Sequence, residues 1–455
     1  MKRTFRDEFQ GALLGDARRS ERMVELAVAL ATAPAASFPE VLGDGAELEA
    51  AYRFLGNPDV DVEEILEPHA SESVARCREH AVVVVAHDTT DFTYSSERQG
   101  LGRTSGLAKN GYFAHVALAV TPTETRDPLG VLHLEPWVRG EKQPRKHPRK
   151  RREDPDREST RWLRGVAAVE ERLDAGRTIH VMDREADDYD LLCTMVAEKR
   201  RFVVRCSFDR RLEGDEKLRE YTAAQPVVTM RNVPLEERKK SLLPKQRKAH
   251  PPRRERAATL ELKSVVISVK RPTNLPTTLP EVLPIHLVIV EEVDVPTGEP
   301  AVSWRLYTSE PITTAEDVER VVDLYRCRWT IEEFFKALKT GCAIEKRQLE
   351  SYHSLLNALA IYIPIAWRAL RLRCLARANG DGPATTAFTA LQLRIVRLKA
   401  KRSLSASPTL TEALCAVASM GGHLKRNGDP GWLTILRGYE KLLALEEGAL
   451  IAAEM

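Results

Sequence analysis

The chain has 455 residues, with 69 Lys and Arg against 66 Asp and Glu, and a formal net charge of +3. This length suffices for two to four domains, and the near balance of charge means that whole-protein charge does not indicate a nucleic-acid partner. Seven cysteines without a CxxC pair argue against a zinc site or a disulfide framework and suit a reducing cytoplasm. MKRTFRDEFQ lacks a signal-peptide core, and the longest apolar stretch, 355–367, is too short to span a bilayer. We therefore expect a soluble protein.

Residues 1–80 carry the signals of a helical segment. Asp16 is a candidate N-cap, and the apolar residues after it recur at helical spacing. A second helix, 46–55, is predicted to stop at Gly56-Asn57-Pro58, and a third runs from 62 to about 80 with Pro68 inside it.

The pattern then changes to alternating strands and helices. Residues 81–87 form a continuous β-branched run, which is typical of a strand buried on both faces, and we expect it to end in Asp88. Residues 178–182 are a second short buried strand, followed by Asp183. Further strands are expected at 112–120, 130–138 and 201–207, with helices at 160–175 and 187–199. This order predicts a mixed sheet covered by helices.

The second half of the chain divides into three parts. The helical signal disappears between about 225 and 300, where three strand-like runs indicate an all-β insertion. Beyond Thr314 the helical pattern returns, and residues 376–455 are predicted to be helical with Gly, Asn and Pro breaks.

Two strongly basic blocks accompany the predicted strands. Eight Lys and Arg against one Glu lie between Arg139 and Arg152, and nine against one lie between Arg238 and Arg256. Such blocks are commonly solvated loops, and either block alone fits a solvated loop as well as it fits DNA contact. Two of them in one chain favour contact with phosphates.

The segment Tyr325–Lys339 is the most informative part of the chain. Read as one helix at about 100° per residue, it places Tyr325, Arg328, Glu332 and Lys339 within roughly 60° of one another. One face would then carry a carboxylate, two cations and a phenol, the groups needed to hold a metal ion beside a phosphodiester. Glu333 falls about 100° away from that face, so we select Glu332.

Two aspartates at expected strand ends complete this arrangement. Side chains at the ends of strands are presented rigidly to a cleft, and carboxylate oxygens suit Mg²⁺ or Mn²⁺. Taken alone, each aspartate is more often a turn former or an N-cap, and Asp187 or Asp188 fits a cap of the next helix. Asp88, Asp183 and Glu332 together favour a two-metal phosphoryl-transfer site.

These motifs resemble a known family. Asp88-Thr89-Thr90, the Asp-Arg-Glu-Ala-Asp run from Asp183, and the Tyr-(two)-Arg-(three)-Glu-(six)-Lys spacing are similar to the DDE transposases of the Tn-five-like branch of the IS-four insertion-sequence family. The resemblance also includes Leu14 to Arg19, the run Trp304 to Pro311, and Gly421-Gly422 with the helix that follows, so it covers nearly the whole chain.

The resemblance implies an α/β protein with an RNase H-like mixed-sheet core interrupted by a β-rich insertion. Helical domains would flank this core. The implied domains are 1–80 for binding transposon ends, 81–375 for catalysis with the insertion at about 225–300, and 376–455 for dimerisation.

The resemblance also implies roles for individual residues. Asp88, Asp183 and Glu332 would be the catalytic metal ligands, holding Mg²⁺, with Mn²⁺ as a substitute, as two ions. Tyr325, Arg328 and Lys339 would grip phosphates, and Trp304 would stack on a displaced base, although a core tryptophan is the plain alternative. The other implied DNA contacts are Arg205, which is equally typical of a strand edge, and Arg18, Arg19 and Arg22, which would also suit a basic turn paired with Glu21 or Glu25. His87 and the very basic 139–152 loop depart from the family pattern without removing a catalytic residue.

The implied activity is cut-and-paste transposition through a hairpin at the transposon end. Its partners would be transposon-end DNA, target DNA and a second copy of the chain in a synaptic complex, with no membrane. The location would be the bacterial cytoplasm, in association with the nucleoid. Two alternatives remain: a structure-specific nuclease on the same core, and a non-catalytic DNA-binding inhibitor of transposition.

Overall fold

The computed structural model describes residues 6–43, 45–104, 110–140, 157–235, 237–238, 251–378, 380–424 and 430–454. The chain forms two compact units. The first contains Met1–Arg145, Ala167–Leu173 and Trp329–Met455, and the second contains Lys146–Val166 and Asp174–Arg328. Both units are therefore assembled from segments that are distant in sequence.

The N-terminal segment is helical, as predicted. It contains α1 (Ala17–Thr32), α2 (Phe38–Leu42), α3 (Ala46–Leu55) and α4 (Val62–Arg78). Asp16 caps α1 through its side chain, and Met23, Leu26, Ala27 and Leu30 form the buried stripe of that helix. Helix α4 continues through Pro68.

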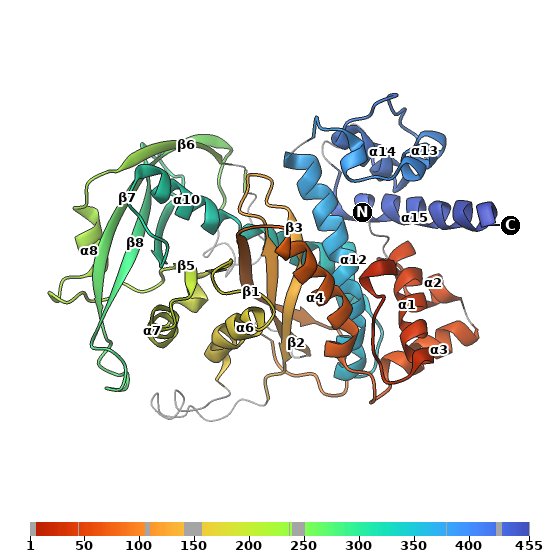
Figure 1. Ribbon diagram of the computed structural model, residues 1–455, viewed down its shortest axis with the longest axis horizontal. Helices are drawn as coiled ribbons and strands as arrows, with labels where there is room; N and C mark the ends of the chain where they lie inside the picture. The colour runs from red at the N-terminus through yellow and green to blue at the C-terminus, as the bar shows by residue number, and fades with distance from the viewer. Residues whose placement is uncertain are drawn as a thin grey trace. The chain divides into compact units, whose positions relative to one another are not determined.

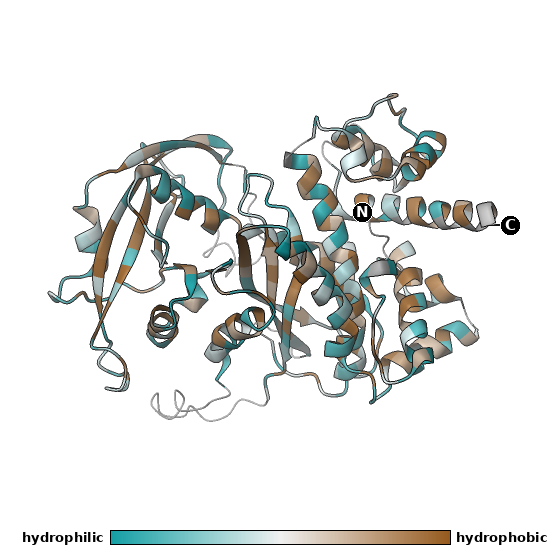
Figure 2. Ribbon diagram, viewed as in Figure 1, coloured by the Kyte–Doolittle hydropathy of each residue, from teal (hydrophilic) through white to brown (hydrophobic). Residues whose placement is uncertain are grey.

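The first unit contains an antiparallel meander of β1 (Val83–Thr93), β2 (Gly111–Val120) and β3 (Pro128–Trp137). Every residue of β2 is buried between its neighbours β1 and β3. Helix α4 and the long helix α12 (Tyr352–Ala378) pack on β3 (Figure 1). Helix α11 (Trp329–Lys336) packs on β1. In Figure 2, β1 and β2 are mostly brown, as expected for strands in a core.

The prediction that Asp88 follows the end of a strand is wrong. Strand β1 continues to Thr93, and Asp88 lies opposite Val116 within the ladder. The strand changes from fully buried to partly buried after His87, so polar residues are accommodated without ending it. Thr89 and Thr90 are β-branched and favour an extended backbone, which explains why the polar run Asp88 to Asp91 is strand rather than turn.

The second unit contains six strands of a mixed sheet, consistent with the α/β class expected from the sequence. Strands β4 (Thr178–Met182) and β5 (Arg201–Arg205) are parallel, and the neighbours that follow are antiparallel. The order is β4-β5-β9-β8-β7-β6, with β9 at Ser303–Thr308, β8 at Val282–Val293, β7 at Arg256–Lys270 and β6 at Thr229–Leu235. The three strands of the predicted insertion, β6, β7 and β8, thus extend this sheet, and the pairing of β8 with β9 joins them to it.

Helices cover the second sheet and close its core. These helices include α7 (Tyr189–Ala197), α8 (Leu218–Ala223), α10 (Ala315–Arg326) and the first half of α6 (Arg161–Glu170). Trp162, Tyr189, Phe202 and Tyr307 are among the largest fully buried side chains in this cluster. A packed core of this kind holds the strand ends in fixed positions.

The C-terminal part of the first unit has a small core of its own. Helices α13 (Ala390–Lys399), α14 (Leu410–Met420) and α15 (Trp432–Glu454) pack with the end of α12. A Cβ added at Gly438 would lie 1.9 Å from the Val417 carbonyl oxygen, and one at Gly421 would lie 2.1 Å from that of Thr434. These glycines therefore permit α14 and α15 to approach closely within one chain.

One helix in the described part of the chain is long and apolar enough to cross a membrane by length and composition, namely Tyr352–Arg377 in α12. It is longer than the apolar run 355–367 noted in the sequence. Most of it is buried in the first unit, where Trp367 donates a hydrogen bond to the Pro128 carbonyl oxygen at 2.8 Å. It therefore has the position of a core helix.

Candidate active site and nucleic-acid interface

Asp88 is held by strand β1 in the first unit. One carboxylate oxygen accepts a hydrogen bond from the Thr89 N–H at 2.8 Å, and the side chain is half-buried. On either side of it in the sequence, His87 stacks on His115 with ring centroids 5.6 Å apart, and the Thr89 hydroxyl lies 3.0 Å from His115 Nδ1. A paired strand with these neighbours fixes the direction of the carboxylate.

The helix predicted for residues 325–339 is interrupted, so that prediction is wrong. Helix α10 ends at Arg326, residues 327–328 form a turn, and α11 begins at Trp329. A π-helical turn then follows at Ala337–Gly341, closed by a hydrogen bond from the Cys342 N–H to the Ala337 carbonyl oxygen at 2.8 Å. Each irregularity changes the helical phase, so a regular 100° rotation does not relate Tyr325 to Lys339.

Glu332 lies in the first turn of α11, the helix that packs on β1. The first unit therefore carries Asp88 and Glu332 on two elements in contact. Glu333 has other partners, because it forms ion pairs with Lys336 at 3.1 Å, Arg373 at 3.3 Å and Arg377 at 3.6 Å. These contacts explain Glu333 as a structural residue, which supports the choice of Glu332.

Lys339 extends from the π-helical turn to the same strand that carries Asp88. Its ammonium group donates to the Asp91 carbonyl oxygen at 2.5 Å, lies 3.7 Å from the Asp91 carboxylate and sits 5.4 Å from the centre of the Phe92 ring. Asp91 is thus part of β1 and positions this lysine.

Asp183 lies directly after β4 in the second unit, as predicted. It also caps the short 3-10 helix Arg184–Ala186, because one carboxylate oxygen accepts the Glu185 N–H at 2.8 Å. Asp183 is therefore both the residue at the end of β4 and the N-cap of the following helix. Asp188 caps α7, which was the expectation for Asp187 or Asp188.

Asp187 has a different role, which the sequence did not reveal. Its buried carboxylate accepts hydrogen bonds from the Ser207 and Phe208 N–H groups at 2.6 and 2.9 Å. It also pairs with the buried Arg210 guanidinium at 2.6 Å. No signal in the sequence joins residues 187 and 210, and the pair fixes the loop after β5 in place.

Asp183 interacts electrostatically with an aromatic and basic group in the second unit. Trp304 on β9 and Tyr325 in the last turn of α10 have ring centroids 5.6 Å apart, and the Arg328 guanidinium lies 5.9 Å from the centre of the Tyr325 ring. Burial raises the pKa of Tyr325, the positive charges of Arg328 and Arg205 lower it, and the negative charge of Asp183 raises it. All five predicted site residues of this unit therefore lie together.

The three N-terminal arginines of α1 have acidic partners. Arg18 bonds Asp16, Arg19 pairs with Asp59 at 2.7 Å, and Arg22 contacts Glu47 and lies 3.5 Å from Glu25. Of the two partners expected from the sequence, Glu21 and Glu25, Glu25 pairs with Arg22. Most of the two basic blocks falls on 141–156 and 239–250, outside the described residues.

The donor set of the predicted triad fits a hard divalent ion, because all three side chains are carboxylates. Within the described ranges no three His, Cys, Asp or Glu side chains are gathered as a metal-binding group. Asp88 and Glu332 belong to the first unit and Asp183 to the second.

Comparisons with known proteins identify two regions of the chain. Residues 1–60 match the family model described as Transposase DNA-binding, and residues 156–365 match the one described as Transposase DDE domain. The second match contains Asp183 and Glu332, whereas Asp88 lies outside both. Among solved structures, the chain is similar to a piggyBac transposase in a cryo-EM synaptic complex with hairpin DNA, with 11% identity and a TM-score of 0.36 over 97% of this chain and 78% of that one. Residues 156–365 thus carry a transposase DDE domain, the domain of an enzyme of DNA cleavage and strand transfer, and residues 1–60 carry a transposase DNA-binding domain.

Proposed function

We propose that the chain is a cut-and-paste transposase of the Tn-five-like branch of the IS-four family. It binds terminal inverted repeats, cleaves through a hairpin intermediate and joins the 3′ ends to target DNA. The observation that carries this proposal is the group of Trp304, Tyr325, Arg328 and Arg205 beside Asp183. Stacking surfaces and guanidinium groups next to a catalytic carboxylate suit a DNA end with an unpaired base.

In this proposal the chain has three functional parts. Residues 1–80 bind the transposon end, residues 81–375 with the insertion at about 225–300 carry the chemistry, and residues 376–455 form the dimer contact. Two copies act together in a synaptic complex. A DNA substrate of this kind places the protein in the bacterial cytoplasm at the nucleoid.

Asp88, Asp183 and Glu332 are the proposed metal ligands. DDE domains generally use divalent ions, and we assign Mg²⁺ as two ions, with Mn²⁺ as a substitute, because the donors are hard oxygens. When bound, such ions polarise the phosphodiester and favour deprotonation of the attacking water or 3′-hydroxyl. The chain's own task is to hold the carboxylates rigidly through β1, the end of β4 and α11.

The remaining site residues position DNA. Tyr325, Arg328 and Lys339 bind phosphates near the cleaved end, and their fixed side chains lower the entropy cost of binding. Trp304 stacks on a base displaced while the hairpin forms. Arg205 contacts the same strand. The α1 arginines Arg18, Arg19 and Arg22 contact the transposon end after exchanging their acidic partners for phosphates.

A plasmid that carries the element's inverted repeats tests the proposal. Water first nicks one strand, the freed 3′-hydroxyl attacks the opposite strand, and water reopens the resulting hairpin. The expected result in Mg²⁺ is recovery of hairpin ends at the repeats and later of joined products. Nicks or random degradation without hairpins would instead support the structure-specific nuclease.

A further inference from the structure

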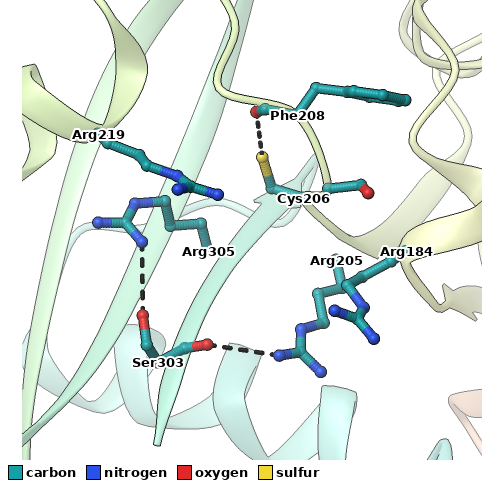
Figure 3. A pocket seen from close by; sticks show the side chains of 8 residues that line it. Arg184, Arg205, Cys206, Phe208, Arg219, Ser303 and Arg305 are labelled. Atoms are coloured by element: carbon teal, nitrogen blue, oxygen red, sulfur yellow. Dashed lines mark hydrogen bonds between the residues drawn. The ribbon is translucent and has the colours of Figure 1, made fainter. Parts of the chain in front are cut away.

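A cavity of about 300 Å³ lies in the second unit, where β5 ends and β9 begins (Figure 3). Four of the residues that line it are arginines, and none is an Asp or Glu. They come from four different elements: Arg184 from the 3-10 helix after Asp183, Arg205 from β5, Arg219 from α8 and Arg305 from β9. No local sequence pattern indicates that these four residues meet.

The arginines stand on two sides of the cavity. Figure 3 shows Arg184 and Arg205 on one side and Arg219 and Arg305 on the other, with Cys206 and Ser303 between them. Ser303 accepts from both sides, because its carbonyl oxygen lies 3.4 Å from Arg205 and its hydroxyl 3.4 Å from Arg305. The two sides are therefore tied to one strand end.

The positive charge of this cavity is mostly uncompensated. Arg305 pairs with Glu291 at 3.1 Å, whereas Arg184, Arg205 and Arg219 make no ion pair within the described part of the chain. Guanidinium groups gathered in this way repel one another unless an anion binds between them. Their planar donor geometry fits the oxygens of a phosphate.

An exposed aromatic residue lies at the edge of the lining, and Figure 3 shows the ring of Phe208 pointing away from the four arginines. Phe208 is 60% exposed, although its backbone N–H is fixed by Asp187 and its carbonyl oxygen accepts from the Cys206 thiol at 3.2 Å. An exposed phenylalanine on a rigid loop beside arginines is the combination that binds single-stranded nucleic acid, because bases stack on the ring while cations hold the backbone. A 300 Å³ cavity lies at the lower end of small-ligand sites, which suits one nucleotide unit and excludes a duplex.

The cavity shares Arg205 with the group around Tyr325. Arg205 lines the cavity and also interacts electrostatically with Tyr325, which in turn senses Asp183. A strand that binds Arg205 at the catalytic group can therefore place its next phosphate in the cavity.

We propose that this cavity is a subsite for single-stranded DNA, in which the two arginine pairs bind backbone phosphate and Phe208 stacks on an unpaired base. The proposal rests on the proposed function, because hairpin formation leaves part of a strand unpaired near Asp183. A free nucleotide offers the same chemistry but lacks the contact at Arg205 that continues toward the catalytic group.

Binding of a fluorescent oligothymidine to the full chain tests this subsite. Phe208→Ala should weaken binding about 10-fold, and Phe208→Tyr should restore it, because one stacked base contributes about 1–3 kcal/mol. Arg219→Ala should reduce the slope of log affinity against log salt by about 0.7. The matched control is Arg211→Ala, an exposed arginine outside the cavity that lies 3.9 Å from Asp215, and it should bind as the parent does.

Three results would overturn the subsite. They are an absence of oligothymidine binding by the parent, equal binding by the Arg219→Ala and Arg211→Ala variants, and binding of thymidine monophosphate as tight as that of the oligomer. Retained binding of duplex inverted repeats would show that the variants are folded. Hairpin formation by the parent reports on the proposed function alone, so failure of the subsite and failure of the proposed function are separable.

Discussion

Glu332 and Glu333 are neighbours on α11 with different surroundings. Both glutamates lie on the helix that packs against the strand of Asp88. Glu333 forms ion pairs with Lys336, Arg373 and Arg377. Glu332→Gln should lower metal-dependent cleavage at least about 100-fold with little change in melting temperature. Glu333→Gln should retain cleavage and destabilise the fold by about 1 kcal/mol, because it loses partly buried ion pairs. Cleavage rates and thermal melts of both variants check this, and a reversed pattern would make Glu333 the ligand.

Lys339 is expected to bind a DNA phosphate. Lys339→Ala should weaken binding of the transposon end and reduce its salt slope by about 0.9, because one phosphate contact is lost. The matched control is Lys336→Ala on the same segment, since Lys336 is exposed and pairs with Glu333 at 3.1 Å. Affinity measured at several salt concentrations checks the effect, and equal slopes for the two variants would contradict a phosphate contact.

Trp304 is expected to stabilise the hairpin rather than the initial complex. Trp304→Ala should retain end binding and first-strand nicking while hairpin yield falls by about 10-fold, because one stacked base is lost. Trp304→Phe keeps an aromatic face and should retain most of the yield. Products are resolved on denaturing gels. Undiminished hairpins in the alanine variant would leave Trp304 as a structural residue of β9.

A buried ionic group joins three elements of the first unit. Glu8, from the 3-10 helix Arg6–Glu8, bonds Arg76 of α4 at 2.6 Å and His69 Nδ1 at 2.7 Å. The Val131 N–H donates to His69 Nε2 at 3.1 Å, so a neutral ring donates from Nδ1 to Glu8. Burial lowers the pKa of His69, which agrees with that state. The group thereby connects the N-terminus to α4 and β3.

This group makes stability depend on pH in a defined window. Burial raises the pKa of Glu8, but the hydrogen bond from His69 and the charge of Arg76 lower it more, to about 2 from 4.5. Because the pKa of Glu8 is lower in the folded state, its carboxylate stabilises the fold at pH values above its pKa in the unfolded chain. This stabilisation is lost as the pH falls from about 5 to 2, by about 3 kcal/mol in all. Glu8→Gln should therefore be less stable at pH 7 and lose less on acidification.

Urea unfolding at several pH values measures this difference. Glu79→Gln, which removes an exposed carboxylate at the end of α4, is the control and should follow the parent. Parallel curves for the parent and Glu8→Gln would show that Glu8 does not carry the pH dependence.

At the scale of elements, local patterns predicted most helices and strands but missed two irregularities at the site. The β-branched run before Asp88 identified β1, the candidate cap Asp16 marked the start of α1, and the predicted return of helix beyond Thr314 agrees with the start of α10. The extension of β1 beyond Asp88 depends on pairing with β2, which a single segment does not encode. No Gly or Pro marks the turn at 327–328, and Gly341 comes only at the end of the π-helical turn, so the positions of both depend on tertiary packing.

At the scale of the whole molecule, the net charge of +3 conceals local concentrations of charge. The resemblance to DDE transposases predicted the three acids and the Trp304 group, because each motif that carries the resemblance is a short run of neighbouring residues. The arginine cavity and the Asp187–Arg210 pair were not predictable, because their residues meet only after β5, β9 and α8 are assembled. Long-range contacts of this type leave no local periodicity.

The central claim of the proposed function is that Asp88, Asp183 and Glu332 are each required for metal-dependent cleavage. The most direct test compares the parent with Asp88→Asn on DNA that carries the inverted repeat, because Asp88 lies outside both family matches. End binding and cleavage are measured together in Mg²⁺. We predict that Asp88→Asn binds the end as the parent does and forms neither nick nor hairpin. Cleavage by Asp88→Asn at the parental rate, or a parent that binds but never cleaves, would contradict the account.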